Sequence, residues 1–71
     1  MPAVDLGRFF FRLIEHDDGS WTCRRGRQDL DRHPGQDEAL AHMTEVAATH
    51  RPSRIYVHHN DGRVFAAASF D

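Results

Sequence analysis

The chain has no lysine, a single cysteine and no long hydrophobic run. Cys23 alone cannot form a disulfide within the chain; a lone thiol is typical of a reducing cytoplasm, although oxidation could join two chains through it. No stretch approaches the roughly 20 apolar residues that a membrane helix requires. The opening residues Met1–Asp5 contain no basic stretch followed by an apolar run, so we expect no signal peptide. Together these absences favour a soluble cytoplasmic protein.

The net charge and the length of the chain further restrict the class of protein that we expect. The 71 residues carry a formal net charge of −2 with neutral histidine, which argues against dominant, non-specific binding of nucleic acid. A chain of this length forms one domain and buries only about 60% of the surface that its unfolded form exposes. Small domains commonly offset such a thin core by binding a metal or by oligomerising.

A first β-hairpin is predicted from Arg8–His16, which is rich in aromatic and branched residues, and from Trp21–Arg25. The intervening Asp17-Asp18-Gly19 suits a three-residue loop, and a two-residue loop centred on Asp18-Gly19 is the alternative. The three-residue loop places Leu13 opposite Cys23 and segregates core residues from solvent residues more cleanly than the two-residue loop, which would place Leu13 beside Arg24. Because a slip of one residue moves every side chain to the other face, we favour the three-residue register.

A second hairpin is predicted from Ser53–His59 and Arg63–Phe70. The dipeptide Asp61-Gly62 between them is the strongest short-range signal for a two-residue type I′ turn. In that register Val57 faces Ala66, and Phe65 lies on the opposite side of the sheet.

A helix is predicted over Gln36–His50, because its apolar residues recur at helical spacing. Gly35 is expected as its N-cap, and Pro52 is expected to end it, since proline disfavours helical geometry in the residue before it. The apolar stripe consists of Ala39, Leu40, Met43, Val46, Ala47 and His50.

The segment Gly26–His33 permits two interpretations. It is either a polar edge strand with Leu30 turned inward or a loop. The predicted fold class is therefore α+β: an antiparallel sheet of two hairpins, possibly with a fifth edge strand, and one helix on one face, in the order ββ(β)αββ. Residues 1–7 are expected to form a flexible N-terminal arm, and residues 8–71 a single domain.

Three segments resemble a known bacterial family. They are Asp18-Gly19-Ser20-Trp21, Asp37-Glu38-Ala39 at the start of the helix, and the run from Val57 to Val64, Val-His-His-Asn-Asp-Gly-Arg-Val. The pattern is similar to Domain of Unknown Function family 2188, whose members show Asp-Gly-Gly-Trp, acidic residues before alanine, and Val-His-x-x-Asp-Gly-Arg-Ile.

The resemblance spans residues 9–70. It departs from the family where Ser20 replaces the second glycine and where Gly35 stands in place of a threonine cap. It implies a fold and a bacterial origin, and it brings no established activity with it.

The face of the sheet without the helix is the candidate functional surface. One helix covers one face, and exposed aromatic patches commonly mark an interface. Aromatic and basic residues alternate on this face, and the predicted binding residues are Phe10, Arg12, Ile14, Arg24, Tyr56, His58, Arg63 and Phe65. The alternative is that residues 1–7 or Gly26–His33 cover this face.

Two functions fit such a surface. The first is a non-enzymatic protein-interaction module that self-associates as a dimer, or binds another protein, through the sheet face or edge. The second is weak single-stranded nucleic-acid binding, with aromatic rings stacking on bases and arginines meeting phosphates.

Catalysis and metal binding are not expected from the spacing of reactive residues. The sequence contains no Gly-x-Ser-x-Gly motif, no glycine-rich phosphate loop and no Cys-x-x-Cys pair, so we predict no enzyme activity and no cofactor. The acids in the two turns, Asp17, Asp18 and Asp61, are turn formers. Six histidines invite a metal site, but His58 and His59 point to opposite faces of a strand, and His42 and His50 are two helical turns apart. The histidines are therefore interpreted as surface residues, and no metal ligand is predicted.

Overall fold

The computed structural model describes residues 9–71, which form one helix and five strands. The predicted arm, residues 1–7, and Arg8 at the predicted strand start lie outside the described residues. The elements in chain order are β1 (Phe9–Glu15), β2 (Trp21–Arg25), β3 (Gln28–His33), α1 (Gln36–Ala48), β4 (Ser53–His58) and β5 (Val64–Phe70). The predicted order ββ(β)αββ is confirmed, with Gln28–His33 as the fifth strand.

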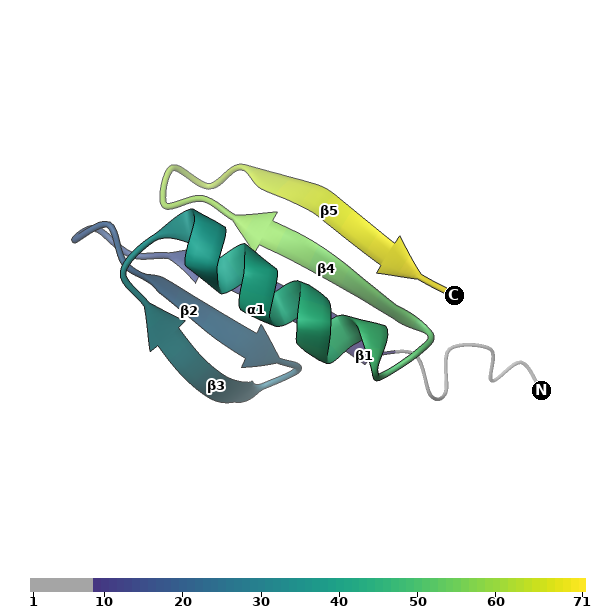
Figure 1. Ribbon diagram of the computed structural model, residues 1–71. Coiled ribbons are helices and arrows are strands. Elements are labelled where there is room, and N and C mark those ends of the chain that lie inside the picture. Colours follow the sequence, from purple (N-terminus) through teal and green to yellow (C-terminus); the bar gives the residue numbers. More distant parts are fainter. Residues whose placement is uncertain (1–8) are drawn as a thin grey trace.

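The sheet is mixed, and the prediction of a wholly antiparallel sheet is wrong. The strand order is β3-β2-β1-β4-β5, and β4 pairs parallel to β1 in its centre. The cause is the path of α1, which returns from the end of β3 to the end of the sheet where β1 begins (Figure 1). Phe9 consequently pairs with Ser53, and the two strands run in the same direction.

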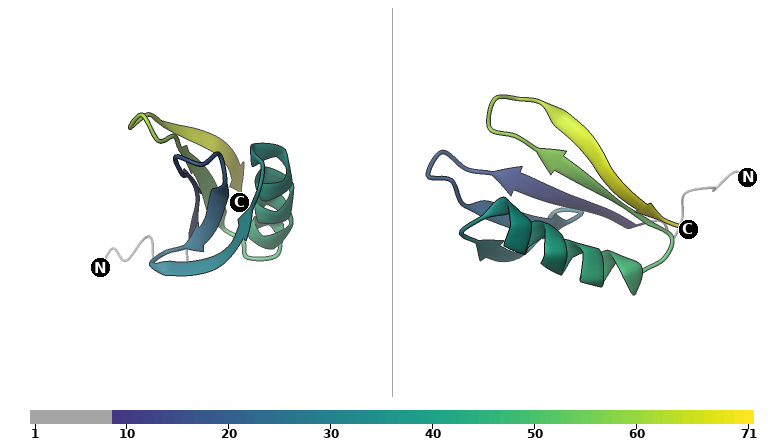
Figure 2. Two further views of the ribbon diagram at one scale, coloured as in Figure 1. Left: turned by 90° about the vertical axis from the view of Figure 1, so that its left-hand side faces the viewer. Right: turned by 45° about the horizontal axis from the view of Figure 1, so that its top comes forward.

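The core lies between α1 and one face of the sheet, and no element formed by residues 9–71 covers the opposite face (Figure 2). Ala39, Met43 and Ala47 of the predicted stripe are buried, while Leu40 and Val46 pack against the margin of the core. The sheet contributes Phe11, Leu13, Trp21, Cys23, Ile55 and Val57. Alternation along each strand therefore separates a buried set from a second set on the uncovered face.

The helix begins as predicted, with Gly35 as an extended N-cap at φ −141°. It ends at Ala48, two residues earlier than predicted. The backbone N–H groups of Thr49 and His50 bond back to Val46 and Ala47 at 3.2 and 3.1 Å and close the last turn. The His50 ring packs edge-on against Phe9, with 5.3 Å between centroids, so it still belongs to the apolar side of the segment.

The first hairpin has the predicted three-residue loop. The backbone N–H of His16 bonds to Ser20 at 2.9 Å, and Leu13 pairs with Cys23. Gly19 has φ +87°, the left-handed conformation that closes this kind of loop and that glycine adopts without steric penalty. The Asp18 carboxylate accepts hydrogen bonds from the hydroxyl and the backbone N–H of Ser20, which lowers the pKa of Asp18.

The second hairpin differs from its prediction in both turn and register. The N–H of His59 bonds to the carbonyl of Arg63 at 2.8 Å, which encloses three residues, and Gly62 alone has positive φ, at +94°. A type I′ turn needs positive φ at two positions, so the two-residue turn is excluded. A bulge then restores the expected register: Val57 pairs with Phe65 rather than Ala66, whereas Ile55 pairs with Ala68.

A second bulge changes the edge strand β3. Cys23 pairs with Asp31 while the next residue, Arg24, pairs with Asp29. Leu30 is the extra residue and is 37% exposed, so the inward orientation considered for it is wrong. Beyond the bulge, Asp31 and His33 share the helix-covered side with Cys23 and Trp21.

Candidate functional site

Six of the eight predicted binding residues lie on the uncovered face of the sheet, here called the open face. They alternate with buried core residues along β1, β2 and β4. These six are Phe10, Arg12, Ile14, Arg24, Tyr56 and His58. Their place on one surface is as predicted, while their role in binding stays a prediction.

Phe10 and Tyr56 form the aromatic centre of the open face. Their rings lie 6.3 Å apart with an interplanar angle of 26°, in a stacked arrangement. Phe10 is 39% exposed, so part of its ring is available to a partner. The stack arises because β1 and β4 are adjacent, a consequence of the parallel pairing.

Arginines surround this aromatic pair. Arg12 pairs across the strands with Tyr56, and Arg54 pairs with Phe10. Arg24 donates to Asp29 at 2.8 Å, and Arg32 lies 3.3 Å from Asp18. Burial lowers the pKa of His58, and the positive charge of Arg12 lowers it further.

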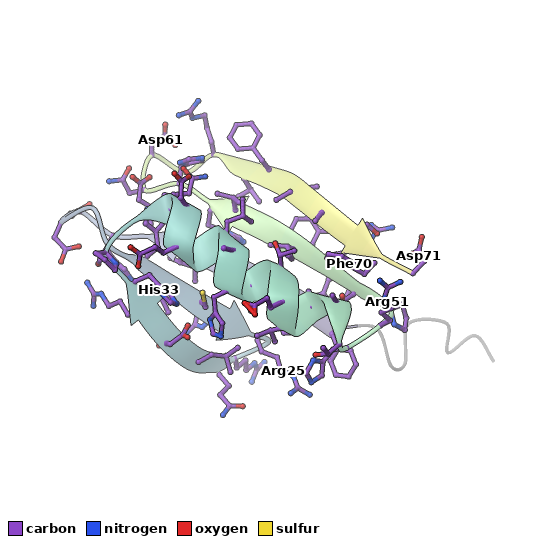
Figure 3. The ribbon with its side chains drawn as sticks, viewed as in Figure 1. Arg25, His33, Arg51, Asp61, Phe70 and Asp71 are labelled. Atoms are coloured by element: carbon purple, nitrogen blue, oxygen red, sulfur yellow. The ribbon has the colours of Figure 1, made fainter. Side chains whose placement is uncertain are left out.

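Phe65 and Arg63 do not lie on the open face, contrary to their prediction. Directly opposed residues project to the same side of a sheet, so Phe65 shares the side of buried Val57. The His59 ring stands edge-on between Phe65 and Trp21, at 5.5 and 5.6 Å from their centroids. Arg63 lies over the Phe65 ring at 5.7 Å and pairs with Asp61 at 2.7 Å, beside the turn labelled in Figure 3.

The outer edge of β5 is a second exposed feature. This strand has the sequence Val-Phe-Ala-Ala-Ala-Ser-Phe and contains no charged residue. Val64 and Phe65 are 52% and 49% exposed, and Ala66 and Ala67 are also exposed. The opposite edge, β3, carries Asp29, Asp31 and Arg32. Charged residues protect an edge from pairing with another strand, and among the described strands β3 has this protection while β5 does not.

The end of β5 is held by Arg51. Its guanidinium lies 5.5 Å from the centroid of the Phe70 ring and donates to the backbone oxygen of Asp71 at 3.4 Å; all three residues are labelled in Figure 3. These contacts attach the last strand to the loop after α1, so the unprotected edge is fixed in place at its C-terminal end.

Four residues with metal-binding side chains meet under α1, and they were not predicted as a group. One ligand atom each from Cys23, Asp31, His33 and His42 lies within 4.8 Å of the others. His33 stands at the end of β3 near the start of the helix (Figure 3). Burial, together with the Asp31 carboxylate, raises the pKa of the Cys23 thiol to about 12.

Only part of this four-residue group could be recognised from the sequence. Asp31 and His33 are two residues apart, so a strand places them on one side. Their position opposite Cys23 depends on the bulge at Leu30, and the approach of His42 depends on the placement of the helix. Spacing rules alone therefore treated these histidines as unrelated surface groups.

Residues 9–71 enclose no pocket, and no helix among them is long and apolar enough to cross a membrane. The molecule is thus a small α+β domain: a five-stranded mixed sheet with one helix on one face, an open face on the other and one uncharged edge. The model of the family described as "uncharacterized protein conserved in bacteria (DUF2188)" matches residues 11–70. The chain belongs to this family, and the predicted resemblance is confirmed. No curated protein and no solved structure matches the chain.

Proposed function

We propose that this protein is a non-enzymatic interaction module that forms a homodimer by pairing the β5 edges of two copies. The observation that supports this best is the absence of charge along a seven-residue exposed edge strand. An edge strand presents unpaired backbone N–H and C=O groups, which a second strand can satisfy.

The composition of β5 favours a second copy as the partner. In an antiparallel pair about a two-fold axis, residue i of one copy faces residue j of the other and j faces i, so like charges on the strand would be brought close together. Val64 to Phe70 carry no charge, and small alanines at the centre allow close approach. Val64 and Phe65, both about half exposed, supply apolar area at the end of the strand.

The electrostatics of the open face favour the edge over face-to-face stacking. The open face carries Arg12, Arg24, Arg32 and Arg54; Arg24 pairs with Asp29 and Arg32 pairs with Asp18. Two copies stacked through this face would bring like charges together, which is destabilising. Edge pairing avoids this contact and leaves both open faces accessible.

The expected affinity is modest. One pair of seven-residue strands buries less than the roughly 1,200 Å² of a standard stable interface. We therefore expect a dissociation constant in the micromolar range, where monomer and dimer exchange with concentration.

Sedimentation velocity over a concentration series tests this proposal. The wild-type protein is expected to shift from monomer to dimer, and Ala66→Lys is expected to remain a monomer because each dimer would then carry two lysines, one from each copy, on the paired edges. The matched control is Leu30→Lys, which adds the same charge at an exposed position of the opposite edge. A wild type that stays monomeric at millimolar concentration, or a Leu30→Lys variant that dissociates equally, overturns edge pairing.

Single-stranded nucleic acid is the second candidate partner, and the observation that favours it is the Phe10–Tyr56 stack surrounded by arginines. Bases would stack on the exposed ring, and phosphates would meet the guanidinium groups. This binding would use the open face and is compatible with a dimer formed at the edge.

Fluorescence anisotropy with a labelled single-stranded oligonucleotide tests the second candidate. Binding should weaken as salt rises, and Arg12→Ala and Tyr56→Ala should each reduce it. Phe65→Ala is the matched control, because its ring lies on the helix side and its loss should leave binding unchanged. No binding at low salt, or equal loss in the control, excludes the open face as a nucleic-acid surface.

A further inference from the structure

The fold brings Cys23, Asp31, His33 and His42 together from three separate elements. Cys23 on β2 and Asp31 on β3 are cross-strand partners, and His33 projects to the same side two residues later. The helix supplies His42 one turn after Ala39, whose carbonyl oxygen accepts the Cys23 S–H at 3.6 Å. The cluster therefore joins β2, β3 and α1 at a single point.

The distances within the cluster are close to those of a coordination sphere. His42 Nδ1 lies 2.8 Å from Asp31 Oδ2, and His33 Nε2 lies 3.3 Å from Asp31 Oδ1. The largest separation among the four ligand atoms is 4.8 Å. Ligand atoms around a tetrahedral zinc ion are separated by roughly 3.3–3.8 Å, given its bond lengths. A contraction of about 1 Å in the widest pair would complete that geometry.

Three polar atoms of the cluster are buried without a hydrogen-bond partner. They are Asp31 Oδ1, His33 Nε2 and His42 Nδ1. Although His42 Nδ1 lies near Asp31, the two side chains lack the angles of a hydrogen bond. Buried polar groups in folded proteins are nearly always satisfied, so this set of unsatisfied lone pairs needs a partner. A cation at the centre of the cluster would satisfy all three atoms.

The chemistry of the four donors selects the cation. One thiolate, two neutral imidazoles and one carboxylate suit zinc, whereas magnesium and calcium prefer oxygen ligands alone. The two negative charges of Cys23 and Asp31 would balance Zn²⁺. We propose that Cys23, Asp31, His33 and His42 form a four-coordinate zinc site that links the edge strand β3 to β2 and α1.

Such a site has a structural role. Four protein ligands leave no open position for water or substrate, which is the arrangement of structural zinc sites. A domain of 71 residues has a thin core, and a metal that joins three elements adds stability at β3, an edge strand that pairs with one neighbouring strand. The site lies toward the edge opposite β5, so it does not depend on the proposed dimer.

The competing interpretation is a cluster without metal, in which Asp31 lies between two histidines that are charged only when protonated. That arrangement predicts no stoichiometric binding of zinc. It also leaves Cys23 as an inert buried thiol.

Isothermal titration of the metal-free full chain with Zn²⁺ separates the two interpretations. We expect one zinc ion per chain and a rise in Tm on addition of zinc. Cys23 is buried in the core, so its replacement could prevent folding; the decisive variant is therefore His42→Gln, at a partly exposed helix position. This variant should keep the circular dichroism spectrum of the metal-free protein and lose zinc affinity by about 100-fold or more.

His58→Gln is the matched control, because it removes a histidine from the open face and leaves the four ligands intact. It should bind zinc like the wild type.

Co²⁺ serves as a second probe: a thiolate-to-cobalt charge-transfer band in the near ultraviolet is expected for the wild type and not for a folded Cys23→Ser variant. Absence of stoichiometric zinc binding, or equal weakening by His42→Gln and His58→Gln, overturns the proposal.

Discussion

The hydroxyl of Ser53 donates a hydrogen bond to the carbonyl oxygen of Ala47 at 2.8 Å, inside the core. This bond attaches the first residue of β4 to the last turn of α1, where the helix would otherwise leave a carbonyl group without a strong partner. The same carbonyl also accepts the N–H of His50 at 3.1 Å, so loss of the hydroxyl does not leave it entirely unsatisfied.

Replacing Ser53 by alanine is therefore expected to destabilise the protein by about 1 kcal/mol. Urea unfolding followed by circular dichroism measures the change. Ser69→Ala is the matched control, because Ser69 is exposed on β5 and its loss should change stability by less than about 0.5 kcal/mol. Equal effects of the two substitutions would show that the buried bond contributes nothing.

The core residue Ile55 is fully buried, whereas Leu40 packs only against the margin of the core. Ile55→Ala should lower the free energy of unfolding by about 3–4 kcal/mol, because it removes buried methyl groups and leaves a cavity. Leu40→Ala should lower it by roughly half as much, since its surroundings can adjust to the loss. Thermal and urea unfolding of both variants gives the ranking, and a larger loss for Leu40→Ala would contradict the observed burial.

Gly62 has φ +94° in the turn between β4 and β5. A side chain at this position meets no neighbouring atom but must adopt a backbone conformation that L residues disfavour. Gly62→Ala should therefore destabilise the protein by about 1 kcal/mol, and Gly62→Asn by less, because asparagine tolerates this conformation. Similar stabilities for the wild type and Gly62→Ala would indicate a different turn.

The protonation of His58 makes the stability of the folded protein depend on pH. Burial and Arg12 lower its pKa in the folded protein from the ordinary 6.5, so the unfolded chain binds a proton that the folded chain does not. The free energy of unfolding should consequently decrease as the pH drops below about 6.5, until the pH reaches the pKa of His58 in the folded protein. His58→Gln should show a shallower decline over this range in urea unfolding at a series of pH values. Parallel curves for the two proteins would contradict the lowered pKa.

The two hairpins show how far side-chain pattern determines register. In the first, only one of the two possible loops keeps Leu13 opposite Cys23 and Arg12 opposite Arg24, so the prediction was correct. In the second, three consecutive alanines carry no polarity that distinguishes one face from the other. The three-residue loop could therefore shift the register by one residue at Phe65, and the bulge could restore it at Ile55, without a penalty visible in the sequence.

Contacts between distant segments were harder to predict than local turns. The helix and its N-cap followed from spacing and composition, because these are properties of one continuous segment. The parallel pairing of β1 with β4, and the meeting of His33 with His42, depend on where α1 returns across the sheet. A single sequence carries little information about that path, which is why the sheet was expected to be antiparallel and the four-residue cluster was missed.

The central position of β4 beside β1 has a consequence for synthesis on the ribosome. Among the strands of residues 9–71, Phe11 and Leu13 belong to the first one to emerge, yet their neighbours Ile55 and Val57 emerge about forty residues later. A nascent chain that ends before Ser53 has three strands and a helix but lacks the middle of its own sheet. Folding of this domain to completion is therefore expected only after β4 and β5 have left the exit tunnel, and products truncated before Ser53 should be targets for chaperones and proteases.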